Sequence, residues 1–139
     1  MNREIKFRGK DRENWHYGDL VQEIRHNDNK LFDGTMTHIR NFEYKNGDYI
    51  GDSFPVNPDT IGQYTGLQDE NGKEIYEGDI VRIIVNNNIE KICRVEFKNG
   101  IFGVMFSKNK DLTAFPHFCN TTFEVIGNEY DNPELLGGE

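Results

Sequence analysis

The stretch that decides the fold spans residues 60–85 and reads TIGQYTGLQDENGKEIYEGDIVRIIV. Its glycines, at positions 62, 66, 72 and 78, come too regularly for a helix and too often for one long strand, so each marks a turn or a bulge. Asn71-Gly72 stands between two apolar segments, and this dipeptide is typical of a hairpin tip. The stretch therefore predicts short β-strands joined by turns.

The end of this stretch predicts a strand that is half buried. Val81, Ile83 and Val85 alternate with Arg82 and Ile84, and a period of two places every second side chain on one face. The same alternation, broken by turn residues, predicts further strands at residues 4–8, 15–21, 39–44, 49–50, 89–97 and 124–126. Residues 101–106 are apolar at both parities, which fits a strand covered on both sides. A single helical turn is predicted at residues 132–136, with Asn132 as its N-cap and Pro133 at its first position.

Short strands separated by turn residues every ~8–12 positions favour a barrel or a sandwich. We predict an all-β fold with minor helical content, in which the hairpins of a strand meander pack on a small SH3-like barrel. The meander would form an N-terminal subdomain of residues 1–58, and the barrel a C-terminal subdomain of residues 59–139. Two prolines in the segment 54–58 predict an extended connector at the boundary. We expect the two subdomains to form one folded unit.

Six segments of the chain carry a family resemblance. Three lie in the central stretch, TIGQYTGL at 60–67, DENG at 69–72 and IYEGDIV at 75–81, and three lie near the ends, REIKFRG at 3–9, FEVIGN at 123–128 and NPELL at 132–136. Together they resemble the YopX family of phage and prophage proteins, with residues 21–58 matching loosely. The resemblance implies a small β-rich protein carried by phages or prophages, mainly of Gram-positive bacteria. It implies no activity and no catalytic residues.

Composition narrows the classes of partner. With 16 basic and 24 acidic residues the chain has a formal net charge of −8, which opposes the phosphate contacts of general nucleic-acid binding. We interpret the acidity as a source of solubility. Cys93 and Cys119 are the only cysteines, and no long apolar run occurs, so the sequence predicts neither a disulfide framework nor a membrane span. The expected location is the bacterial cytoplasm.

Sequence motifs for bound cofactors are absent. The chain has no GxxxxGK[ST] segment and no GxGxxG segment opening a helix. Its four histidines are dispersed without an HExxH pattern: His16, His26, His38 and His117. A calcium loop with Gly72 at its turn position would place ligands at Leu67 and Gly78, which cannot serve. We therefore expect no cofactor.

Two residue sets could still form a chemical site. Cys93, His117 and Cys119 would supply three zinc ligands if their strands converged, but zinc sites usually show paired CxxC or HxxxH spacing, which favours two partly buried thiols and a surface histidine. The second set is Glu74, Glu77 and Asp79. Two of these carboxylates would have to lie across a cleft from each other to act as general acid and base. Charged residues beside turns are usually solvated, and we favour that interpretation.

The best candidate for a recognition patch is Trp15 with Tyr17, near Arg8 and His16. Trp, Tyr and Arg dominate the hot spots of protein interfaces. The alternative is that Trp15 lies in the core of a small β domain, as a lone tryptophan commonly does. Binding residues remain unassigned at this point.

Because no catalytic constellation is present, the sequence favours binding over catalysis. We expect a phage or prophage accessory protein that acts as a non-catalytic protein-binding module, with a phage or host protein as its partner. Exposed strand edges also predict a homo-oligomer. Two alternatives stay open. One is a nucleic-acid-binding β-barrel, and the other is an enzyme of unknown type that uses acidic residues.

Overall fold

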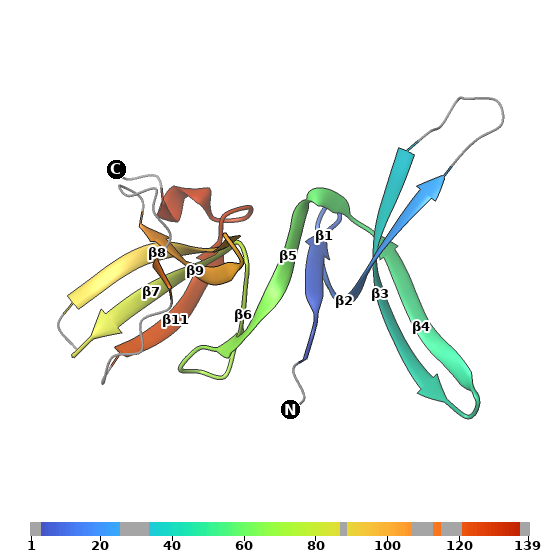
Figure 1. Cartoon of the computed structure of the whole chain (residues 1–139), viewed down its shortest axis with the longest axis horizontal. Helices are drawn as coiled ribbons and strands as arrows, with labels where there is room; N and C mark the ends of the chain where they lie inside the picture. The colour runs from blue at the N-terminus through green and yellow to red at the C-terminus, as the bar shows by residue number, and fades with distance from the viewer. Residues whose placement is uncertain (1–3, 26–33, 87–88, 107–112, 115–120, 137–139) are drawn as a thin grey trace. The chain divides into compact units, whose positions relative to one another are not determined.

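The structure, a computed structural model, describes residues 4–25, 34–86, 89–106, 113–114 and 121–136. The chain divides into two units, Met1–Gln63 and Tyr64–Glu139, which we describe separately as unit 1 and unit 2. Apart from one short 3-10 helix the described elements are strands, arranged in two antiparallel sheets (Figure 1). The predicted mostly-β fold is confirmed. The boundary predicted after Pro58 falls inside a strand, because residues 57–63 continue to pair within unit 1.

Unit 1 is an antiparallel sheet in which the second strand changes partner. Strand β1 (Phe7–Lys10) pairs with the start of β2 (Trp15–Arg25), at residues 15–18, and with the first part of β5 (Asn57–Gln68). Residues 19–25 of β2 pair instead with β3 (Gly34–Lys45). The strand order within unit 1 is therefore β4-β3-β2-β1-β5, and the sixth strand of this sheet, β6 (Glu74–Tyr76), pairs with the part of β5 that belongs to unit 2. We call the point between residues 18 and 19 of β2, where its pairing partner changes from β1 to β3, the fork.

Gly18 makes this fork possible. Its φ is +155°, and a Cβ placed on it would lie 2.3 Å from the carbonyl oxygen of Arg40 in β3. Any side chain at this position would push the two strands apart, because an added carbon cannot approach backbone oxygen so closely. The glycine thus lets β3 reach β2 next to the residue at which β1 begins.

Beyond the fork, β3 continues as a two-stranded ribbon with β4 (Asp48–Pro55). Residues 38–45 of β3 pair with residues 48–55 of β4, but in the described chain residues 41–45 have no third strand beside them. We call residues 41–52 the arm. The turn at its tip is Asn46-Gly47, with φ values of +53° and +87°, as in a hairpin turn of type I′, and it joins the strands predicted at residues 39–44 and 49–50. Figure 1 shows the arm as the free end of the β3–β4 hairpin.

Unit 2 contains a five-stranded sheet. Unit 2 begins with the last residues of β5 and with β6 (Glu74–Tyr76), which form the predicted hairpin around Asn71-Gly72. The five-stranded sheet follows, and its strand order is β10-β9-β8-β7-β11. Its strands are these: β7 (Asp79–Val85), β8 (Ile89–Lys98), β9 (Ile101–Phe106), β10 (Thr113–Ala114) and β11 (Thr121–Asn128). Among the described residues no pairing joins β10 to β11, so the structure gives an open sheet and the SH3-like barrel stays a prediction.

The core of unit 2 lies on one face of β7, β8 and β9. Its buried members are Ile75, Val81, Ile83, Cys93, Val95 and Val104, and Phe102, Phe123 and Val125 pack against them. The predicted inward face of Val81 and Ile83 is confirmed. Phe97 has the same parity as Cys93 and Val95, but it is exposed because it lies at the far end of β8, past the core.

The predicted helical turn is present as the 3-10 helix η1 (Pro133–Leu135), with Pro133 at its start. Asn132 occupies the N-cap position as predicted. The side chain of Asn132 makes no capping bond, and its Oδ1 instead accepts a hydrogen bond of 3.2 Å from the backbone N–H of Asn128. Among the described residues, no helix has the length and apolar character needed to cross a membrane.

Candidate interaction surface

A hollow of about 370 Å³ lies at the fork of unit 1. It is lined by residues that precede β1, by residues of β2 where the strand changes partner, and by residues of β3 at the base of the arm: Glu4, Ile5, Lys6, Tyr17, Gly18, Asp19, Arg40, Asn41 and Phe42. Tyr17 and Phe42 bring aromatic rings that are 44% and 41% exposed. Ligand pockets have volumes of ~300–1,000 Å³, and the hollow lies near the lower end of this range. Its size therefore suits one side chain with its adjoining backbone better than a cofactor.

In the part of the chain that the structure describes, two charged side chains of the hollow have no opposite charge bound to them. Lys6 Nζ lies 3.2 Å from Glu4 Oε1, so these two neutralise each other. Asp19 and Arg40 face each other across β2 and β3, yet in the described part of the chain neither side chain makes a hydrogen bond or an ion pair. The guanidinium carbon of Arg40 lies instead 5.0 Å from the ring centre of Phe42. Its buried Nε has no hydrogen-bond partner.

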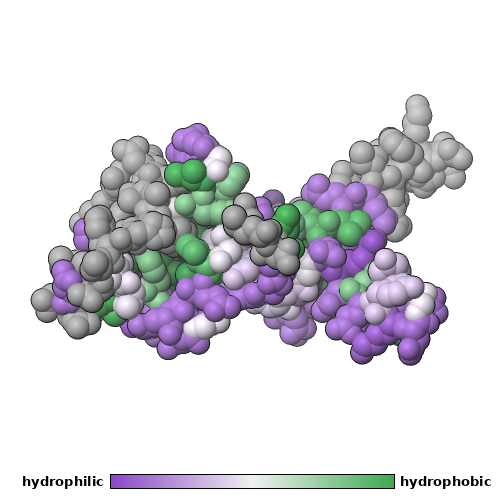
Figure 2. Space-filling view, turned by 60° about the horizontal axis from the view of Figure 1, so that its bottom comes forward, coloured by the Kyte–Doolittle hydropathy of each residue, from purple (hydrophilic) through white to green (hydrophobic). Residues whose placement is uncertain are grey.

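Exposed aromatic rings extend this surface along the arm. Phe42, Tyr44 and Tyr49 lie on the face that carries Arg40, because side chains two residues apart and directly opposite pairs share a face. Tyr44 and Tyr49 are 65% and 74% exposed, and their ring centres are 5.1 Å apart. On the right-hand part of the face shown in Figure 2, hydrophobic residues lie among hydrophilic ones. The surface is therefore aromatic within a polar surround.

The predicted patch around Trp15 is divided by the sheet. Arg8, Trp15 and Tyr17 lie on one face, and the Arg8 guanidinium carbon is 4.6 Å from the Trp15 ring centre. Trp15 is half-buried and Tyr17 is exposed, whereas Arg8 is only 4% exposed. The grouping with His16 was wrong, because adjacent residues of a strand point to opposite faces. The His16 ring stacks on Phe54, with ring centres 4.0 Å apart.

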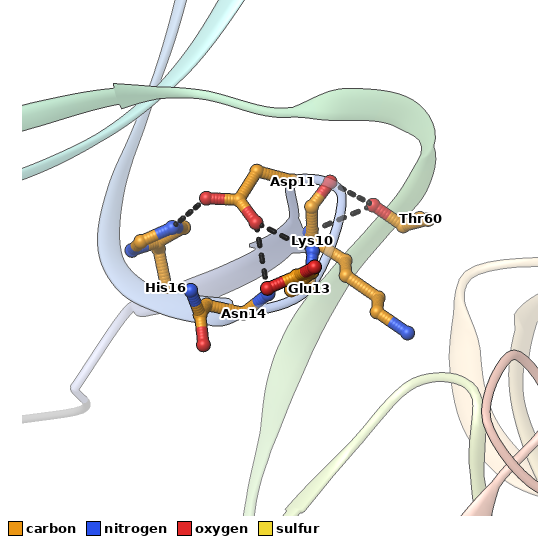
Figure 3. A network of polar contacts seen from close by, with 6 residues as sticks. All are labelled: Lys10, Asp11, Glu13, Asn14, His16 and Thr60. Carbon is orange, nitrogen blue, oxygen red and sulfur yellow. Dashed lines mark hydrogen bonds and ion pairs between the residues drawn. The ribbon is translucent and has the colours of Figure 1, made fainter.

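His16 belongs to a polar network that holds the β1–β2 turn. Its Nε2 lies 2.7 Å from Asp11 Oδ2, and the other oxygen of Asp11 accepts hydrogen bonds from the N–H groups of Glu13 and Asn14 (Figure 3). The hydrogen bond with His16, followed by those from the backbone, lowers the pKa of Asp11 well below its usual range. All of these bonds are local, so the network shapes a turn.

Thr60 completes this network from β5. Its hydroxyl oxygen accepts a hydrogen bond of 2.8 Å from the backbone N–H of Lys10 and donates one of 2.7 Å to the carbonyl oxygen of Asn57. Figure 3 shows Thr60 beside the backbone of Lys10, where it joins β1 to β5. A hydroxyl that is already bonded on both sides to backbone is a poor nucleophile, and we assign it a structural role.

In unit 2, Asp69 binds the turn before β6 to the outer edge of the sheet. Asp69 Oδ1 accepts hydrogen bonds from the N–H groups of Asn71 and Lys73, at 2.8 and 2.9 Å, and Oδ2 accepts one of 2.9 Å from Val125 in β11. The N–H of Glu70 also donates to the carbonyl oxygen of Phe123. Because β11 is the last strand of its sheet, these bonds satisfy part of an otherwise open edge.

The electrostatics of Asp69 follow from this geometry. Burial by itself acts to raise its pKa, but the backbone hydrogen bonds from Val125, Lys73 and Asn71 favour the charged form, and the net result is a lowered pKa. The acidic turn that first suggested a ligand loop is thus occupied by bonds to its own backbone.

Two of the three carboxylates weighed as acid and base accept hydrogen bonds from Tyr76. Asp79 is buried and accepts a hydrogen bond of 2.7 Å from the N–H of Tyr76. Glu74 accepts one of 3.1 Å from the Tyr76 hydroxyl. Glu77 is half-buried in the turn between β6 and β7. These contacts give Asp79 and Glu74 structural roles around Tyr76, and no catalytic role is assigned to the set.

The possible zinc ligands cannot be compared, because His117 and Cys119 lie outside the described residues. Cys93 is fully buried in the core of unit 2, and burial raises the pKa of its thiol to about 11. Among the described residues, no group of three or more His, Cys, Asp and Glu side chains could hold a metal ion.

Apart from Tyr17, the residues of the arm and the hollow were not singled out from the sequence. Arg40, Phe42, Tyr44 and Tyr49 look like ordinary strand residues beside an Asn-Gly turn. The available sign was that residues 39–50 place apolar side chains at both parities around Asn46-Gly47. Their full exposure depends on the lack of a third strand beside the arm in the described chain, which no local pattern indicates.

Comparisons with known proteins agree on one family. A stretch of 71 residues is 42% identical to a Bacillus subtilis (strain 168) protein described as "SPbeta prophage-derived uncharacterized protein YopX"; it covers 48% of this chain and 53% of that protein. The chain thus spans about half the length of this curated relative. The X-ray structure of protein yopX from Bacillus subtilis superposes with a TM-score of 0.55 at 27% identity, over 94% of this chain and 96% of that one.

A second solved structure, protein EF1440 from Enterococcus faecalis, gives a TM-score of 0.51 at 24% identity, over 97% of this chain and 99% of that chain, and this likeness shows a shared fold. The family model described as "YopX protein" matches residues 6–137. This match includes every described strand of both units. The chain therefore belongs to the YopX protein family.

Proposed function

We propose that this protein is a phage or prophage accessory protein that binds another protein through the exposed face of the arm and the adjoining hollow. The prophage origin named for the Bacillus subtilis relative supports the first part of this proposal. The bacterial cytoplasm is the location proposed with it, and the partner would be a phage or host protein.

The observation that carries the proposal is the exposed aromatic face of the arm. Every residue from 41 to 52 is exposed, including the rings of Phe42, Tyr44 and Tyr49. An isolated two-stranded hairpin is only marginally stable in water, and aromatic side chains are enriched at the centres of protein interfaces. A partner that covers this face would bury the rings and stabilise the ribbon at the same time.

Binding rather than catalysis is also supported by the contacts of the polar residues. Asp11, Thr60, Asp69 and Asp79 each make hydrogen bonds to backbone groups of neighbouring segments. These groups hold turns and strand edges in place, so their chemistry is used for structure.

The test is affinity capture from phage-infected host cells with the wild-type chain and with Tyr44→Ser/Tyr49→Ser. We expect one partner captured by the wild type to be lost with this variant. The matched control is Phe97→Ser, since Phe97 and Phe102 form a similar aromatic pair on β8 and β9 with ring centres 4.8 Å apart. Equal capture by all three proteins would contradict the proposal.

Self-association is a secondary proposal. Strand β4 is the outer strand of its sheet among those described, and an open edge can pair with a second copy. Light scattering over a range of concentrations tests it, and a monomer at high concentration would count against it.

A further inference from the structure

We propose that the hollow at the fork binds an extended peptide segment of another protein, with an apolar side chain set between Tyr17 and Phe42 and the flanking peptide groups bonded to Asp19 and Arg40. This inference rests on the proposed function and adds the chemistry of the ligand to it.

The aromatic walls determine the apolar part of the ligand. Tyr17 lies on β2 and Phe42 on β3, on either side of the fork, and both rings line the same hollow. Ile5, which is also exposed, adds a third apolar wall. Burying an apolar side chain against such walls yields ~25 cal/mol for each Å² removed from water. The volume of about 370 Å³ leaves room for the backbone on both sides of that side chain.

The unpaired charges determine the polar part. After Glu4 and Lys6 have paired, the hollow retains one cation, Arg40, and one anion, Asp19. Although the two are opposite in register, Arg40 stacks on Phe42, and in the described structure neither has a hydrogen-bond partner. A guanidinium only donates hydrogen bonds and a carboxylate only accepts them. A matching ligand must therefore offer an acceptor and a donor close together.

A peptide meets this requirement, and a phosphate does not. Each peptide unit carries one carbonyl acceptor and one N–H donor, and it has no net charge. A phosphate would be attracted by Arg40 but repelled by Asp19, and the chain's net charge of −8 adds to that repulsion. Because the lining carries one unpaired positive and one unpaired negative charge, it favours a ligand without net charge.

The experiment is an NMR titration of the full ¹⁵N-labelled chain with the capped peptide acetyl-Gly-Phe-Gly N-methylamide. We expect saturable shifts of the backbone amide signals of Gly18, Asp19, Asn41 and Phe42, with a Kd on the order of 1 mM. Acetyl-Gly-Ser-Gly N-methylamide keeps the peptide groups without the apolar side chain, and adenosine monophosphate supplies a phosphate and an aromatic base. Both should bind at least ~10-fold more weakly.

Two substitutions test the polar part. Arg40→Gln and Asp19→Asn remove the charges with little change in size, and each should weaken binding of the phenylalanine peptide by ~10-fold or more. Lys98→Gln, at the exposed end of β8 and outside both the hollow and the arm, should leave binding unchanged. Far-UV circular dichroism checks the fold of each variant. If Arg40→Gln does not fold, the exposed Asp19→Asn still decides the question.

Several results would overturn the inference. These are the absence of saturable shifts, equal binding of the serine peptide, tighter binding of the nucleotide, or unchanged affinity in both charge variants. Failure of this inference can be told apart from failure of the proposed function. A partner that is lost with Tyr44→Ser/Tyr49→Ser but retained by Arg40→Gln would leave the arm as the binding surface and exclude the hollow.

Discussion

Replacing Asp69 with alanine should destabilise unit 2 by about 3 kcal/mol. The side chain is only 8% exposed and accepts three backbone hydrogen bonds. A hydrogen bond to a charged group contributes ~1.5–3 kcal/mol, and a buried donor left unpaired costs ~1–3 kcal/mol. Asn71 and Lys73 are exposed, so water can replace the carboxylate there and we assign about 0.5 kcal/mol to each bond. Val125 is half-buried, and its bond accounts for the remaining ~2 kcal/mol.

The assay is urea unfolding followed by far-UV circular dichroism, with hydrogen exchange of the Val125 amide as a local measurement. The alanine variant should show a lower free energy of unfolding and faster exchange at Val125. Trp15 lies in unit 1, so its fluorescence reports on the other unit and should be recorded separately. Glu70→Ala is the matched control, because the hydrogen bond from Glu70 uses its backbone N–H, which the substitution keeps.

The contribution of Asp69 should also depend on pH. Its pKa is lowered in the folded protein relative to an unfolded value of ~3.9. A lowered pKa means that the stabilisation is fully present above the unfolded pKa and is lost as the pH falls through the folded one. The difference in stability between the wild type and Asp69→Asn should therefore shrink below pH ~4. A loss under ~0.5 kcal/mol for the alanine variant, or a difference that is constant at acidic pH, would refute the reasoning.

Three further predictions concern single residues. Cys93 should resist alkylation by iodoacetamide in the folded protein and react after unfolding, as peptide mapping by mass spectrometry would show, because its thiol is buried with a pKa of about 11. Gly18→Ala should lower the free energy of unfolding by ~1–3 kcal/mol, whereas Gly47→Ala, with nothing within 4 Å, should cost less. His38→Phe should stabilise unit 1 by ~1 kcal/mol in the same urea assay, because both buried ring nitrogens lack hydrogen-bond partners in the described structure.

Local patterns predicted the elements of this fold well. The alternation of Val81 and Ile83, the turn at Asn46-Gly47 and the hairpin around Asn71-Gly72 all appear where the sequence places them. Each depends on interactions within a few residues, such as the preference of Asn-Gly for positive φ. The prediction failed where neighbours in sequence point apart, since His16 and Trp15 lie on opposite faces of β2.

The candidate site, in contrast to the strands and turns, could not be predicted from local sequence patterns. No pattern in the sequence singles out Arg40 or Phe42, because their role depends on where β1 and β3 leave β2 and on which residues then remain uncovered. The acidic turn at Asp69 is another case. As a sequence it resembles a ligand loop, and only the position of β11 shows that its carboxylate is bonded to Val125.

The sequence by itself therefore determined the fold class, the positions of the turns and the family of this protein. These properties follow from side-chain periodicity and turn chemistry, which act over short distances along the chain. The tertiary structure alone decided which strand edges are covered, which faces carry the aromatic rings of the arm, and which charges remain unpaired in the hollow. Those properties depend on contacts between segments far apart in sequence, and pairing partners of that kind are not encoded in any single stretch.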